Sequence, residues 1–319
     1  MYPSVGYPAG SEDAAPRTTG PRSMASVRKT SVRPPTEHLR LRLLRRHETL
    51  GRIHRGLADG DATAESLHDW HRELRRLRVE ARPWVALAPR ARTEGWGETD
   101  RALKGFSSGI GKVRNYDVGL QLIERLPGRV RREAAEPLAE LKRALRRLAQ
   151  RGRRELKEAA MEMPLPTLLE AAGRPLRASL SRGASDRLAR EFNERLAVQV
   201  ARVERALARA YRRPRVARLH ALRIELRTLR SLDQASSAVI DRTPLPFSVA
   251  LRSLQYDLGQ LHDWDVLRET ADSALQGRSR RVVDRILAER VRAARRRVVR
   301  LLDRKPVRRD IESLLRAGP

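Results

Sequence analysis

The feature that most constrains the fold of this 319-residue chain is a pair of segments that recur in the same order. LKGFSSGIGKVRNYDV, which begins at Leu103, aligns without a gap with LRSLQYDLGQLHDWDV, which begins at Leu251. Upstream, LHDWHRELRRLR from Leu67 aligns with LHALRIELRTLR from Leu219. Chance similarity between two basic amphipathic helices would explain the upstream match alone. Two matches in one order, at offsets of 148 and 152 residues, indicate instead a duplicated unit.

Apolar residues at helical spacing continue through most of the chain, and no segment alternates as a strand would. The first expected helix starts after Thr36, a suitable N-cap, and further helices are expected at about 63–88, 98–114, 116–126 and 131–160. The same order returns at about 185–212, 215–240, 246–262, 264–276 and 278–304. The sequence therefore predicts an all-α fold.

The first 35 residues differ in composition from the rest. They are rich in Pro, Gly, Ser and Thr, and they show no periodic apolar face. We therefore expect a disordered tail at residues 1–35 and a folded domain at residues 36–319. Its first helical half is expected at about 36–160 and its second at about 185–304.

The charge of the chain points to an anionic partner. The formal net charge is +29, and all but six of the 68 basic residues are arginine. A guanidinium is a planar fork of donors that matches phosphate oxygens. High genomic GC content would favour arginine over lysine, but it does not account for the net charge, which implies a polyanion.

Several classes of protein are excluded. The chain has no cysteine, so disulfides and thiolate metal sites are absent. No segment approaches the 18 apolar residues of a membrane span, so we expect no membrane insertion. The N-terminus lacks the apolar core of a secretory signal, and we expect a cytoplasmic protein.

Basic residues in the recurring upstream segment gather on one stripe of the expected helix. At about 100° per residue, the second copy aligns His220, Arg223, Arg227 and Arg230 beside a row of leucines. The first copy aligns His68, His71, Arg75 and Arg78 in the same way. A solvated basic helix usually spreads its charges over its outer face. Stripes that recur at the edge of the packing face favour two helices that face a shared groove, where arginines repel by about 1 kcal/mol per pair until an anion binds.

These residues carry a resemblance to a known family. HALRIELRTLR followed by LQYDLGQLHDWDV resembles the second-half signature of the CHAD family, the conserved histidine α-helical domain. HDWHRELRRLR and GIGKVRNYDV resemble the first-half signature more loosely, and the similarity spans about residues 36–304. The resemblance implies two antiparallel helical bundles related by a pseudo-two-fold axis. It also implies a basic groove that binds inorganic polyphosphate without turnover.

The resemblance also implies which residues bind. From the second half it indicates His220, Arg223, Arg227, Arg230 and Arg252. From the first half it indicates His68, Arg75, Arg76, Arg78, Lys104 and Arg114. His71 stands where the family pattern favours arginine, yet its imidazole can still donate a hydrogen bond, so it joins the expected polyphosphate-binding residues.

Other chemistry has little support. Asp117 and Asp265 follow glycines and are expected to cap the next helix. His262 has carboxylates nearby but no serine or cysteine nucleophile, so no catalytic residue is expected. The segment from Gly105 does not match a phosphate-binding loop. His68 and His71 share a helix face without further ligands, and neither a metal nor another cofactor is expected.

We therefore expect a non-catalytic module whose partner is inorganic polyphosphate, with association with polyphosphate granules as a further hypothesis. The alternative is a sequence-nonspecific nucleic-acid-binding protein, which the same charge would serve. Only 4% of the residues are aromatic, which leaves little for base stacking. A phosphohydrolase is a third, weaker reading, because a cluster of metal-binding carboxylates is lacking.

Overall fold

The structure of the chain is a computed structural model that describes residues 34–316, apart from residues 62, 88–95, 166, 168–182 and 246. Its helices are α1 (Pro35–Asp59), α2 (Ala64–Leu87), α4 (Trp96–Glu124), α5 (Gly128–Glu133), α6 (Ala135–Glu162), α8 (Ala184–Arg212), α9 (Val216–Ile240), α10 (Val249–Ala274), α11 (Gly277–Leu302) and α12 (Lys305–Arg316). No strand occurs among the described residues, and the predicted all-α class is confirmed. The expected tail lies, up to Arg33, outside the described residues.

The limits of α1 follow from its local sequence. The helix begins at Pro35, whose fixed φ suits the first helical position, and Pro34 occupies the N-cap. Thr36 therefore lies inside the helix, and the N-cap role predicted for it is wrong. The helix ends at Gly60, whose φ of 102° is left-handed, and the Gly60 N–H donates to the Leu57 carbonyl at 3.2 Å.

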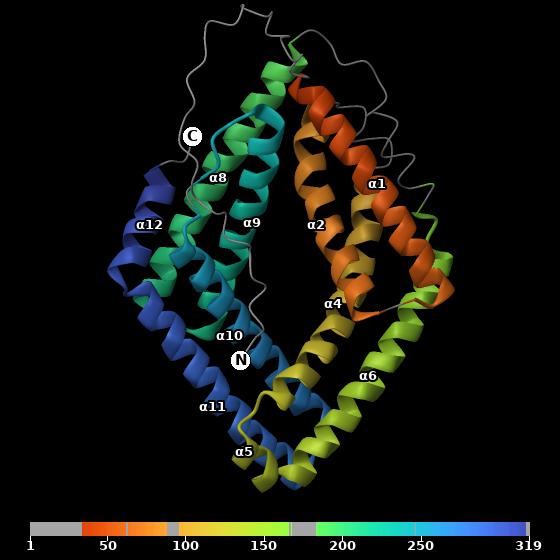
Figure 1. Ribbon diagram of the computed structural model, residues 1–319, viewed down its shortest axis with the longest axis vertical. Helices are drawn as coiled ribbons and strands as arrows, with labels where there is room; N and C mark the ends of the chain where they lie inside the picture. Colours follow the sequence, from red (N-terminus) through yellow and green to blue (C-terminus); the bar gives the residue numbers. More distant parts are fainter. Residues whose placement is uncertain are drawn as a thin grey trace, which may run out of the picture. The chain divides into compact units, whose positions relative to one another are not determined.

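Helices that follow one another in the chain pack as neighbours (Figure 1). In the first half, α1 packs on α2 and α4 packs on α6; in the second, α8 packs on α9 and α10 packs on α11. The order of pairs is the same in both halves, as a repeat would require. The duplication itself stays a prediction.

The helices α4 and α10 each run unbroken where two helices were expected. The predicted breaks between residues 114 and 116 and between residues 262 and 264 are wrong. A glycine inside a helix costs only about 1 kcal/mol, so Gly111 and Gly259 do not end these helices. Buried residues such as Leu258, Leu261 and Leu267 keep helical spacing across the expected break, and their packing holds α10 together.

Asp117 and Asp265 consequently do not cap helices. Both lie in helix interiors, where the first-turn N–H groups that a cap would accept are absent. Asp117 instead accepts from Arg153 of α6 at 2.7 Å. The capping prediction is wrong because it depended on the breaks that the structure lacks.

The two halves share their core. One apolar cluster combines α1 and α2 with α8, α9 and α10, and it includes Trp70, Phe192 and Leu226. A second cluster combines the C-terminal part of α4 and α6 with α10 and α11. At Gly119 of α4 a Cβ would lie 2.9 Å from Leu267 of α10, so glycine lets these two helices approach closely. Contacts of α2 with α8 and α9 join the halves at another place.

Candidate anion-binding cleft

Two adjoining cavities, which share lining residues, lie where α2 meets α9. The first, of about 420 Å³, is closed by α4 and α10 and takes its basic lining from Arg72, Arg75, Arg76, Arg114, Arg223, Arg227 and Arg230. The second, of about 240 Å³, shares Arg75, Arg227 and Ser231 with the first and adds Arg78 and Arg82. We call the two cavities together the arginine cleft. Its walls come from both halves of the chain.

The helix α2 places its arginines in the cleft because its acidic residues face α1. Glu73 and Glu80 are buried against α1, where both accept from Arg46, at 2.5 and 2.6 Å. The carboxylates of α2 that face α1 are therefore paired with an arginine of α1. Arg75 and Arg82 lie on another side of the same helix and line the cleft.

Several guanidinium groups in the cleft lack a described carboxylate partner. Arg75, Arg114, Arg223 and Arg227 form no ion pair within the part of the chain that the structure describes. The Nε atoms of Arg75 and Arg227 are buried and have no hydrogen-bond acceptor among those residues. A buried hydrogen-bond donor normally has an acceptor. Leaving a charged donor without an acceptor costs more free energy than leaving a neutral donor without one.

The pKa values of these arginines reflect the accumulation of charge. Burial and the charges of Arg223, Arg75 and Arg114 lower the pKa of Arg227 to about 10. Burial likewise lowers the pKa values of Arg75 and Arg223. Arg46 shows the opposite behaviour: although burial opposes it, hydrogen bonds and charges from Glu80 and Glu73 raise its pKa. The cleft thus differs from the contact between α1 and α2, where two glutamates pair with Arg46.

The histidines at the cleft are held neutral. Burial, followed by the charges of Arg75 and Arg227, lowers the pKa of His71 to about 4. Burial and Arg223 lower the pKa of His262 to about 3. The rings of His262 and His220 lie 4.4 Å apart between centroids. At neutral pH these imidazoles are therefore hydrogen-bonding groups without charge.

The rest of the first cavity is polar and almost free of acid. Asp263 is its one carboxylate among the described lining residues. Burial raises the pKa of Asp263, while Arg114 and Arg223 lower it. Arg230 donates to the side-chain oxygen of Gln255 at 3.2 Å, which orients that guanidinium along the wall.

The structure brings most of the predicted binding residues together. The cleft is lined by His71, Arg75, Arg76, Arg78, Arg114, Arg223, Arg227 and Arg230. Two of these already have acidic partners, since Arg76 pairs with Glu73 at 2.8 Å and Arg78 with Asp100 at 2.5 Å. Their charge is partly compensated.

Four predicted residues do not line the cleft. His68, Lys104 and Arg252 are exposed, and Arg252 donates to the carbonyl of Phe247 at 2.8 Å. His220 packs on His262 beside the cleft. Lys104 precedes Arg114 by ten residues, or about 15 Å along the axis of α4, and so belongs to another part of that helix.

Several lining residues were not expected from the sequence. Arg72 and Arg82 lie at i−3 and i+7 from Arg75, so Arg72 falls beside the α2 stripe and Arg82 extends it by one turn, and the helical period would have found them. Tyr256 and Gln260 of α10 also line the first cavity, and no charge pattern in the sequence marks them. Past Arg82, a further hollow of about 330 Å³ includes glutamates with its arginines and is less positive.

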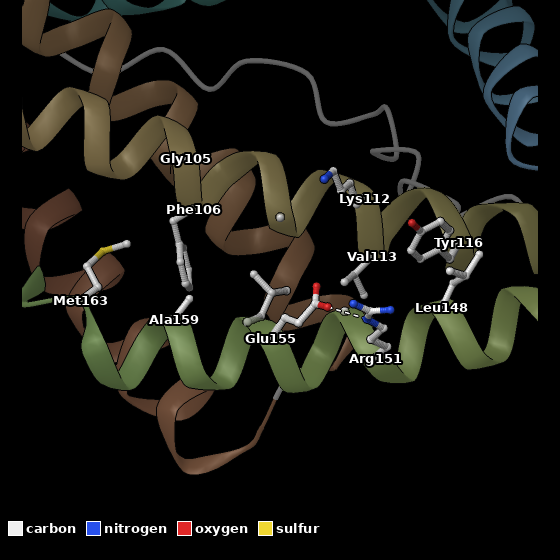
Figure 2. Close-up of a pocket in the computed structure, with 13 residues that line it drawn as sticks. Gly105, Phe106, Lys112, Val113, Tyr116, Leu148, Arg151, Glu155, Ala159 and Met163 are labelled. Carbon is white, nitrogen blue, oxygen red and sulfur yellow. Dashed lines mark hydrogen bonds and ion pairs between the residues drawn. The ribbon is translucent and has the colours of Figure 1, made fainter. Parts of the chain in front are cut away.

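A separate hollow between α4 and α6 has a different character (Figure 2). It measures about 480 Å³, and Phe106, Val113 and Leu156 are among its apolar lining. Arg151 and Glu155, which also line it, form an ion pair in which Nε of Arg151 lies 2.7 Å from Oε1 of Glu155 (Figure 2). This hollow does not bring several unpaired cations together, and none of its described lining residues also lines the arginine cleft.

Neither a metal centre nor a membrane span emerges from the described residues. They contain no group of three or more His, Asp or Glu side chains that would hold a metal ion. None of their helices carries an 18-residue stretch apolar enough to cross a bilayer.

Comparison with known proteins identifies the kind of domain. The family model of the CHAD domain matches residues 41–272. The crystal structure of the CHAD domain from the plant Ricinus communis superposes with a TM-score of 0.61 at 18% identity, covering 92% of this chain and 98% of that chain. PptA from Streptomyces chartreusis gives a TM-score of 0.58 at 18% identity, with 85% and 100% covered. At this identity both structures show a shared fold. No curated protein matches the sequence.

Proposed function

The chain belongs to the CHAD domain family, and from this premise we propose that it binds inorganic polyphosphate in the arginine cleft without converting it. One observation carries the proposal. Arg75, Arg114, Arg223 and Arg227 converge on one cavity, from α2, α4 and α9, and no described carboxylate pairs with them. A site with this excess of positive charge, and with Asp263 as the one carboxylate among its described lining, suits a ligand that supplies several negative charges at close spacing.

The guanidinium chemistry favours phosphate. Arginine forks donate two parallel hydrogen bonds to phosphate oxygens, and such charge-assisted bonds are about twice as strong as neutral ones. Each repulsion between neighbouring arginines, on the order of 1 kcal/mol, is relieved when an anion lies between them. The buried Nε atoms of Arg75 and Arg227 would then gain the acceptors that they lack.

The shape of the cleft supports a chain of phosphates over a nucleic acid. The second cavity adjoins the first at Arg75 and Arg227, so arginines line two neighbouring cavities. Tyr256 is the one aromatic residue among the described lining of both cavities. Single-stranded nucleic acids usually need several stacking platforms, so a ligand without bases fits better.

The lowered pKa of His71, the histidine next to Ser107, supports binding without catalysis. The hydroxyl oxygen of Ser107 lies 3.3 Å from Nδ1 of His71, which resembles a nucleophile and its base. A histidine whose pKa is about 4 is a weak base at neutral pH, and no described carboxylate bonds the other ring nitrogen. Incubation with polyphosphate, with and without magnesium, should release no orthophosphate above background.

The experiment that tests the proposal compares two triple variants. Arg223→Ala, Arg227→Ala and Arg230→Ala remove arginines of the cleft, whereas Arg280→Ala, Arg281→Ala and Arg285→Ala remove the same formal charge from α11. We expect the cleft variant to lose at least about a hundredfold in polyphosphate affinity, with a shallower salt dependence because fewer counterions are released. The α11 variant should lose far less.

Titration with duplex DNA at the same salt concentrations completes the test. Tighter binding of DNA than of polyphosphate would favour the nucleic-acid alternative. Equal losses in the two triple variants would show that bulk charge, and not the cleft, attracts the ligand.

A further inference from the structure

A second group of arginines lies at the turn between α8 and α9, against the C-terminal part of α11. It lines an open hollow of about 610 Å³, with Pro214 and Val299 as the apolar contribution. We call this group the turn cluster, and its members are Arg212, Arg213, Arg215, Arg295, Arg296 and Arg300. None of them lines the arginine cleft.

The turn cluster carries unbalanced charge. All six side chains are exposed, none pairs with a described carboxylate, and no acidic residue is part of the described lining. Two other arginines of α11 do pair with carboxylates, Arg280 with Asp272 and Arg297 with Asp257, each at 2.5 Å. The six arginines of the turn cluster lie together without such a described partner.

Interaction with the negative ends of helix dipoles stabilises only some arginines of the turn cluster. Arg212 and Arg300 lie in the last turns of α8 and α11, where a cation offsets the negative end of the helix dipole. Arg213 is the C-cap of α8. Arg215 instead is the N-cap of α9, where the dipole is positive and no side chain caps the first N–H groups. A cation there adds to a positive end and raises the local potential.

The α11 side of the cluster is also unfavourable without a partner. Arg296 and Arg300 are four residues apart, so like charges face each other on one side of the helix. Arg295 adds a third cation to the same hollow. Two elements thus bring several repelling guanidinium groups to one place, and an anion would relieve the repulsion.

We propose that the turn cluster is a second site for a phosphate chain, so that one protein molecule holds two segments of polyphosphate. The ligand class is that of the proposed function, on which this inference rests. The hollow is open and its lining is mostly guanidinium, so it suits a run of phosphoryl groups that passes across it.

The two sites are close enough to share one long chain and far enough apart to be separate. Arg215 precedes Arg223 by eight residues on α9, which is about 12 Å along the helix axis. A long polyphosphate that leaves the cleft is therefore held near the turn cluster at a high effective concentration. Two different chains can also occupy the two sites, and the protein then cross-links them.

The test uses tripolyphosphate, a probe short enough to occupy one site at a time. Equilibrium dialysis at low salt should give two bound molecules per protein. The variant Arg213→Gln, Arg215→Gln and Arg296→Gln should bind one. A matched control, Arg146→Gln, Arg147→Gln and Arg154→Gln, removes three exposed arginines of α6 that pair with no described carboxylate, and it should still bind two.

Long-chain polyphosphate supplies a second measurement. Light scattering from cross-linked assemblies should fall at least about fivefold in the turn-cluster variant and stay within about twofold in the control. All exchanged side chains are exposed, so circular dichroism and thermal melting should be unchanged in both variants. One bound tripolyphosphate in the unmodified protein, or equal behaviour of the two variants, would overturn the second site.

A cleft variant separates failure of this inference from failure of the proposed function. Arg75→Gln, Arg223→Gln and Arg227→Gln should reduce the stoichiometry from two to one and leave the turn cluster occupied. If the unmodified protein binds one equivalent and only the cleft variant loses it, the function stands and the second site does not. If the cleft variant binds as the unmodified protein does, the cleft proposal fails instead.

Discussion

The residues of the cleft differ from other arginines of the chain in their partners rather than in their type. The α2 stripe could be predicted from helical spacing, because each residue advances the helix by a fixed angle. Which arginines remain unpaired could not be predicted. Arg78 meets Asp100 and Arg46 meets Glu80, and these pairs join helices whose relative positions depend on the whole core.

At this scale we expect polyphosphate binding to take up protons. The lowered pKa values of His71 and His262, about 4 and about 3, keep both rings neutral in the free protein. The groups that depress them, besides burial, are Arg75, Arg227, Arg223 and Arg114 of α2, α9 and α4, with His68 and His220. A bound polyanion offsets these charges and raises both pKa values, and each unit gained is worth up to tenfold in affinity at low pH.

Affinity should therefore strengthen as the pH falls from 8 to 5.5, by at least about fivefold. Calorimetry in buffers of different ionisation enthalpy would measure the proton uptake. His71→Gln with His262→Gln should flatten the pH profile, and an unchanged profile would contradict the mechanism.

The free protein should respond to pH with the opposite sign. In the unfolded chain these histidines titrate near the ordinary pKa of 6.5, whereas the folded values are lower. The unfolded state then binds more protons between about pH 6.5 and 4, so stability is present above this window and decreases as the pH falls through it.

A second residue-scale prediction concerns the paired side of α2. The Glu80 side chain is 2% exposed and accepts from both Arg42 and Arg46. Glu80→Gln keeps the volume but breaks a buried charge network, and we expect the free energy of unfolding to fall by about 3 kcal/mol. Glu133→Gln breaks the exposed pair with Arg129 and should change stability little. Equal effects in chemical denaturation would contradict this assignment.

At the scale of elements, the sequence located most helices closely. The helices expected at about 185–212 and 215–240 are observed as Ala184–Arg212 and Val216–Ile240. The predicted helix breaks were wrong because helix packing outweighs the local effect of the glycines inside α4 and α10. The helix α12 was not expected, although Val307, Ile311 and Leu314 carry its apolar period and are buried.

Two glycines of the α4–α6 pair should respond oppositely to alanine. At Gly152 a Cβ would lie 2.6 Å from Cγ2 of Val113, so Gly152→Ala should overpack the contact and destabilise by about 1–3 kcal/mol. At Gly111 no atom lies within 4 Å of an added Cβ and φ is not positive. Gly111→Ala should stabilise by about 0.5–1 kcal/mol, because glycine loses more entropy on folding. Urea unfolding of both variants tests the pair, and a stabilised Gly152→Ala would show that α6 can shift.

At the scale of the whole molecule, a ligand in the cleft contacts both halves. Polyphosphate at about 100 times its dissociation constant should stabilise the fold by about 2.7 kcal/mol, since it binds only the assembled cleft. In a domain of this size the melting temperature should then rise by roughly 5–10 °C. Differential scanning calorimetry would measure the rise. The variant Arg223→Ala, Arg227→Ala and Arg230→Ala should lose most of it, and a full rise in that variant would place the ligand elsewhere.

The cleft also bears on the order in which the chain assembles. Arg75 belongs to the first half and Arg227 to the second, so their repulsion is absent from either half alone and begins only when α2 and α9 dock. The docking of the two halves is thus a folding step opposed by charge, and salt or polyphosphate should accelerate it. On the proposed function, polyphosphate would then act twice on this protein, first as an accelerator of its folding and then as the ligand of its folded state.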